Sequence, residues 1–217
     1  MNMRKKVFFI SIVYFSFLLS IKHLSAQAIV EIKIGNQVWF SKNLDVDKFR
    51  NGDTIPEVKS SKEWMMAFNS KQPAWCYYEN NSENNDKYGK IYNWYAVNDP
   101  RGLAPEGWHI PNDSEWKQLI QYLGGGKQAA IKLKNKNGWK NNFCVKNFGN
   151  NMSGFSAIPV GNRAEGFDKN VYACWWSSTE KDEESASFFY LFCNPESELE
   201  LGQSEKVYGL SVRCLKN

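Results

Sequence analysis

The sequence predicts an α+β fold, and three observations indicate it. The first is the alternating run Val30 to Ile34, which Gly35-Asn36 separates from a second apolar run, as in a β-hairpin. The second is a group of helix signals between residues 60 and 134. The third is a set of strand-like segments after residue 154. A hairpin, then helices, then an antiparallel sheet is an α+β order.

The N-terminus has the three parts of a secretory signal peptide. Residues 1–6 are basic, residues 7–21 carry no charge, and Ser25-Ala26-Gln27-Ala28 offers small residues for cleavage. The alternative to a signal peptide is a membrane anchor. A membrane-spanning helix needs roughly 20 residues, and the uncharged run is shorter than that. We therefore expect a signal peptide at residues 1–26 that is cleaved after Ala26 or, alternatively, after Ala28. Residues 27–217 are then expected to form one exported domain without a membrane span.

The formal charge of +4 disappears with this leader. The chain has 27 basic and 23 acidic residues, and the leader holds four basic and no acidic ones. Residues 27–217 are therefore formally neutral. A basic surface for nucleic acid or anionic lipid is not predicted.

Helices are predicted from caps and periodicity. Asn112 with Glu115 has the spacing of a capping box, an apolar stripe from Trp116 to Leu123 follows, and glycines 124–126 end the helix. Ser60 with Glu63 repeats the capping-box spacing. The predicted helices cover about 61–70, 88–97, 112–123 and 127–134.

Strands are predicted for the remaining apolar and aromatic runs. They cover 30–34, 37–40, 74–78, 154–160, 171–179, 187–193 and 208–215. Residues 180–184 form a hairpin end, and residues 194–206 are expected only to connect two strands. The polar run 79–87 has oxygen ligands for calcium, but its spacing does not match an EF-hand. We predict a solvated loop there and no metal.

Catalysis has few residues to use. His109 is the one imidazole after the leader, so a site with several histidines is excluded, and a hydrogen-bonded structural role is expected for it. No acid stands out for glycoside hydrolysis. We predict no cofactor and no enzymatic activity.

Binding is the function class that the composition favours. The chain has nine tryptophans and ten tyrosines, residues that are enriched where an apolar face meets a polar partner. Adjacent strand residues point to opposite faces, so some of these rings are expected to be partly exposed. The predicted ligand-binding residues are Trp175, Trp176, Trp139, Tyr77 and Tyr78, with plain core packing as the alternative for each.

The cysteines leave several pairings open. Export permits disulfides, and an odd count of five leaves at least one thiol outside intramolecular bridges. Their spacing excludes a zinc knuckle and a C-x-x-C pair, and five buried thiols remain the alternative.

Several segments together resemble one family. The segments are 34–44, 75–94, 104–116, 154–163, 175–179 and 208–214. In this order they resemble the Fibrobacter succinogenes major paralogous domain, a secreted bacterial family of largely unassigned function. The helix entry GWHIPNDSEW and the final YGLSVRC also resemble formylglycine-generating enzymes and C-type lectin-like domains. The resemblance implies a compact lectin-like fold in the periplasm, outside the cell or at its surface.

The chain departs from this family at cysteine positions. Relatives carry cysteines where this chain has Ala104 and near Asn85, so the usual partners of Cys214 and Cys76 are missing. A Cys174–Cys193 bridge is the expected replacement, and Cys193–Cys214 is the competing one. The late cysteine pair that would bind copper in the formylglycine-generating enzymes is also missing, so that activity is not expected.

Together these observations predict a secreted, non-catalytic module that binds an extracellular or cell-surface partner, either a glycan or a protein. A structural subunit of a surface assembly and a cryptic glycan-active hydrolase are the alternatives.

Overall fold

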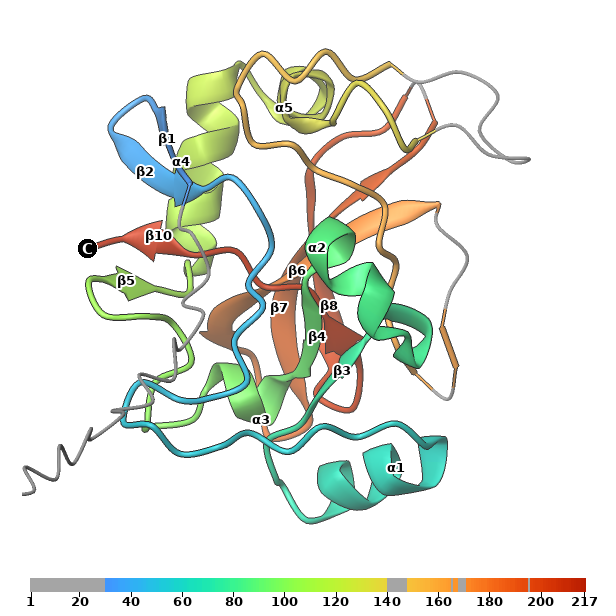
Figure 1. Cartoon of the computed structure of the whole chain (residues 1–217). Helices are drawn as coiled ribbons and strands as arrows, with labels where there is room; N and C mark the ends of the chain where they lie inside the picture. Colours follow the sequence, from blue (N-terminus) through green and yellow to red (C-terminus); the bar gives the residue numbers. More distant parts are fainter. Residues whose placement is uncertain (1–29, 140–147, 165, 168–170, 195) are drawn as a thin grey trace, which may run out of the picture.

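The computed structural model describes residues 30–139, 148–164, 166–167, 171–194 and 196–217. These residues form an α+β fold of short helices around three antiparallel sheets, which confirms the predicted class (Figure 1). Among the helices of these residues, none combines the length and the apolar character that crossing a bilayer requires.

The first sheet joins the two ends of the described chain. Its order is β1-β2-β10-β5, so the last strand lies between the N-terminal hairpin and β5 (Figure 1). Leu215 pairs with Trp39 on one side and with His109 on the other. The predicted hairpin is confirmed, with Gly35 at a positive φ of 62° in its turn. The strands are β1 (Glu31–Ile34), β2 (Gln37–Phe40), β5 (Trp108–His109) and β10 (Leu215–Lys216).

The second sheet has the order β3-β4-β9. It consists of β3 (Trp75–Tyr77), β4 (Lys90–Asn93) and β9 (Gly209–Leu210). The helix predicted over 88–97 is wrong in its first half, because that half is β4 and only α3 (Trp94–Val97) is helical. Asn93 separates the two: its side chain accepts from the backbone N–H of Ala96 and caps the helix.

The third sheet has the order β6-β7-β8. Its strands are β6 (Tyr172–Glu180), β7 (Ser185–Phe192) and β8 (Glu200–Glu205). The predicted hairpin end at 180–184 joins β6 to β7. The sequence did not predict β8, because its residues ELGQSE lack the β-branched and aromatic side chains that mark strands.

Two other strand predictions need correction. Residues 154–160 form no strand, and only Ala157 makes an isolated bridge, to Lys134. The strand predicted over 208–215 is split into β9 and β10, which belong to different sheets.

The helices agree with their local signals. Both capping boxes form, at Ser60 with Glu63 and at Asn112 with Glu115, and Gly124 ends α4 in the left-handed conformation. The polar run 79–87 is not an open loop but a series of short helical turns. The helices are α1 (Ser61–Asn69), α2 (Asn85–Tyr88), α4 (Asp113–Leu123) and α5 (Gly126–Leu133), with 3-10 turns η1 (Tyr78–Asn80) and η2 (Ser82–Asn84).

Candidate functional site

The aromatic residues predicted to bind a ligand lie mostly in the core. Trp139, Trp175, Trp176 and Tyr78 are buried, and Tyr77 is half-buried, so their predicted exposure is wrong for four of the five. Trp175 and Trp176 point to opposite faces of the third sheet as expected, but each face is covered by its own apolar cluster. The predicted residues therefore do not form one accessible surface.

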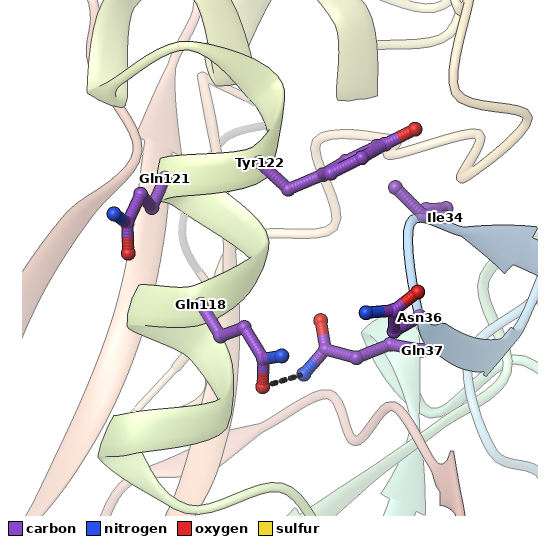
Figure 2. Close-up of a pocket in the computed structure, with 6 residues that line it drawn as sticks. All are labelled: Ile34, Asn36, Gln37, Gln118, Gln121 and Tyr122. Carbon is purple, nitrogen blue, oxygen red and sulfur yellow. Dashed lines mark hydrogen bonds between the residues drawn. The ribbon is translucent and has the colours of Figure 1, made fainter.

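A small pocket lies instead between the β1–β2 hairpin and α4. Figure 2 shows Tyr122 and Gln118 projecting from α4 towards the hairpin, with Gln121 on the other flank of the helix. The pocket has a volume of about 230 Å³. Its lining residues are Ile34, Asn36, Gln37, Gln118, Gln121 and Tyr122.

The helix and the turn place the Tyr122 ring at the surface. Trp116, Leu119 and Leu123 form the buried stripe of α4, and Tyr122 lies beside that stripe, so it is 64% exposed. Gly35 lies directly against the ring, since a Cβ at this position would be 2.8 Å from Tyr122 Cδ2. The hairpin turn thus supports one part of the ring while the rest faces solvent.

Amide side chains of the hairpin and of α4 line the pocket together with this ring. The Gln37 side chain donates to the backbone carbonyl of Glu115 at 2.9 Å and, more weakly, to Gln118 Oε1 at 3.5 Å, which ties the hairpin to α4 (Figure 2). The side chains of Asn36 and Gln121 form no hydrogen bond to the described residues. Four amides, a phenol and one aliphatic side chain line the pocket, and none carries a charge.

Sequence reasoning missed this site. It identified the apolar stripe of α4 but gave no role to Tyr122. The available signal was an aromatic residue outside the apolar stripe of an amphipathic helix. The second signal, the Gly35-Asn36 turn, was read only as a hairpin marker, because nothing local places it against α4.

His109 is hydrogen-bonded, as the sequence suggested. Its Nδ1 lies 2.7 Å from Asn217 Oδ1 and its Nε2 lies 2.8 Å from Glu115 Oε1. Both ring nitrogens are therefore engaged, and Glu115 also accepts the backbone N–H of Asn112 in the capping box. The residue links β5 to the start of α4.

The predicted disulfide and its competitor are both absent. Cys174 and Cys214 each carry a thiol, and the Cys174 thiol donates to the Gly161 carbonyl at 3.0 Å. The register of β6 and β7 explains why Cys174 and Cys193 do not form the predicted bridge. Cys174 lies opposite Tyr190, whereas the Cys193 N–H donates to the carbonyl of Val171, three residues before Cys174 in the chain. The two sulfurs also belong to clusters on opposite faces of the sheet. Cys144 lies outside the described residues.

Metal ligands do not gather in the described part of the chain. No group of three or more His, Cys, Asp or Glu side chains is placed there to hold an ion.

Comparison with known proteins gives a family and nothing further. No curated protein and no solved structure matches the chain. A family profile described as the Fibrobacter succinogenes major domain matches residues 32–216, from β1 to β10. The chain therefore belongs to the Fibrobacter succinogenes major domain family.

Proposed function

We propose that this protein is an exported, non-catalytic binding domain whose pocket at Tyr122 takes a neutral, hydroxyl-rich ligand, a glycan. One observation carries the proposal: an exposed aromatic ring lies beside several amide side chains, and no charged group lines the site. A sugar presents an apolar C–H face and a rim of hydroxyls. A tyrosine ring can pack against the first, and amides can donate to and accept from the second.

Two further features support export and binding. The signal-peptide pattern at residues 1–26 directs the chain to the periplasm, the cell surface or the outside, where glycans are abundant. The lectin-like fold that the family resemblance implies is consistent with this use. The absence of charge in the pocket favours a neutral ligand over an anionic one, because no lining group would compensate the charge.

The proposal that the protein is not an enzyme rests on its hydrogen bonds. His109 is held on both sides by Asn217 and Glu115. Ser177 and Ser187 are fully buried and donate to Asp113, so neither hydroxyl is available as a nucleophile at the surface.

The test is a glycan array followed by affinity measurements on three variants. Tyr122→Ala should bind about tenfold more weakly than the wild type, because the stacking surface is lost. Tyr122→Phe keeps the ring and should retain most of the affinity. Met152→Ala is the control, since this side chain is 75% exposed and does not line the pocket. No binding by the wild type, or equal binding by wild type and Tyr122→Ala, would overturn the proposal.

A further inference from the structure

β8 is an open edge of the third sheet. It pairs with β7 on one side, and the sheet ends there within the described residues. The Lys206 N–H donates to the Glu184 carbonyl, so the ladder to β7 continues through even-numbered residues of β8. The N–H and C=O groups of Leu201 and Gln203 therefore point away from β7. The Leu199 N–H points the same way and already donates to the Gly126 carbonyl, which agrees with this assignment.

Aromatic rings line the sheet face beside this edge. Phe188 and Tyr190 stack with centroids 5.4 Å apart, and Tyr190 and Phe192 meet edge to face at 5.5 Å. Tyr172 of β6 extends the row at 5.6 Å from Phe192, which is 42% exposed. We call these four residues the aromatic row. The rings pack against one another rather than lying flat, which suits side chains of a partner better than the face of a sugar.

At Gly202, Phe188 of the aromatic row contacts the edge strand β8. A Cβ there would be 2.4 Å from Phe188 Cε1, so the Phe188 ring lies over the glycine backbone of β8. A strand added beside β8 would place a side chain opposite Gly202 and on the same face. That side chain would contact the Phe188 ring directly.

Charge decides between a second copy of this chain and a different partner. Glu198, Glu200 and Glu205 form no ion pair with any described residue, and Glu200 only accepts the Tyr190 hydroxyl at 2.7 Å. Two β8 edges brought together would gather six such carboxylates. An extended segment with lysine or arginine would instead compensate them.

We infer that the β8 edge binds an extended basic segment of a partner protein, which adds a strand to the third sheet. Main-chain hydrogen bonds form at Leu201 and Gln203. On the face of the aromatic row, an apolar side chain of the segment lies opposite Gly202 and against Phe188, and a basic side chain two residues away lies opposite Glu200. This is the strand-addition mode of peptide recognition. It uses a surface separate from the Tyr122 pocket.

The experiment measures binding of a fluorescent capped peptide of about eight residues in which lysine and valine alternate along one face and threonine occupies the other face. A peptide with glutamate in place of lysine, and one with alternate amides N-methylated, are the probe controls. The Leu201→Pro substitution removes the backbone N–H that points away from β7, but it removes no hydrogen bond between β8 and β7. The affinity of this variant for the lysine peptide should therefore fall about tenfold. Leu201→Ala is the matched control and should bind like the wild type, while Phe192→Ala should weaken binding.

Amide spectra of the wild type provide a second readout that needs no variant. Binding should shift and protect the amides of Leu201 and Gln203. The inference is overturned if the lysine peptide binds no better than the glutamate peptide, or if the amides of Leu201 and Gln203 stay unchanged. It is also overturned if the Leu201→Pro variant binds the peptide as tightly as Leu201→Ala does, provided that circular dichroism shows the proline variant to be folded. A concentration-dependent dimer that Leu201→Pro abolishes would replace the basic partner by a second copy of the chain.

Discussion

Each tryptophan in this protein is buried, and six of the nine indole N–H groups donate hydrogen bonds to the surrounding described chain. Five indole N–H groups donate to backbone carbonyls, for example Trp139 to Ala157 at 2.8 Å and Trp64 to Val207 at 2.7 Å. Trp175 donates to Asn43. A buried indole can therefore stabilise the loops around it as well as fill volume. Counting tryptophans does not separate this use from ligand binding, which is why the predicted exposure of Trp139, Trp175 and Trp176 was wrong.

Lys134 gives a prediction at the scale of one residue. Its side chain is buried with the ammonium 5.1 Å from the Trp139 ring centroid, and burial lowers its pKa to about 8. Since the folded pKa lies below the unfolded value, the unfolded chain binds more protons between about pH 8 and 10.5. The free energy of unfolding should therefore rise with pH across that window.

Urea unfolding at pH 7.5 and pH 10 tests this pH dependence. The wild type should gain on the order of 2 kcal/mol relative to Lys134→Met over this interval. Lys117→Met, at an exposed position of α4, should follow the wild type. An identical pH response in wild type and Lys134→Met would contradict the assignment.

At the scale of elements, local signals predicted the helices well and the strands less well. A capping box lies within four residues, so Asn112 and Ser60 could be read directly from the sequence. β9 and β10 are separate strands because distant segments pair with them: Leu215 lies between Trp39 and His109. No local pattern contains that information. The Tyr122 pocket was missed for the same reason, because it forms only where the hairpin meets α4.

Asp113 attaches α4 to the third sheet and gives a prediction at this scale. Its carboxylate accepts from Ser177 of β6 at 2.7 Å, from Ser187 of β7 at 3.0 Å and from Lys181 in the turn between them at 2.9 Å. Burial raises the pKa of Asp113, but the hydrogen bonds from Lys181 and the two serines outweigh it, so the pKa lies below its ordinary value.

A depressed carboxyl pKa contributes stability above the unfolded pKa and loses it as the pH falls through the folded pKa. Asp113→Asn should therefore lower the free energy of unfolding by about 2 kcal/mol at pH 7, with the deficit shrinking below about pH 4. Asp86→Asn, an exposed carboxylate on α2, is the control. A deficit that stays constant down to pH 3 would show that charge is not involved.

For the whole molecule, the sequence predicted the class and the family but not the proposed binding surface. The signals for the α+β class and for the family are local segments distributed along the whole chain. The family profile accordingly matches residues 32–216. A binding surface depends on which side chains remain outside once three sheets are packed. Tyr122 and the aromatic row on β6 and β7 stay at least partly exposed, whereas the indoles at 139, 175 and 176 do not. The molecule therefore presents two surfaces, and the glycan proposal concerns only the first.

The central claim is that recognition takes place at the Tyr122 pocket while the tryptophans form the core. Amide and indole N–H spectra, recorded during titration with a glycan that the wild type binds, test this claim most directly. The account predicts shifts at the backbone amides of Gly35, Asn36 and Tyr122, with the indole signals of all nine tryptophans unchanged. Shifts of the Trp139, Trp175 or Trp176 indoles, with those three amides unaffected, would contradict it.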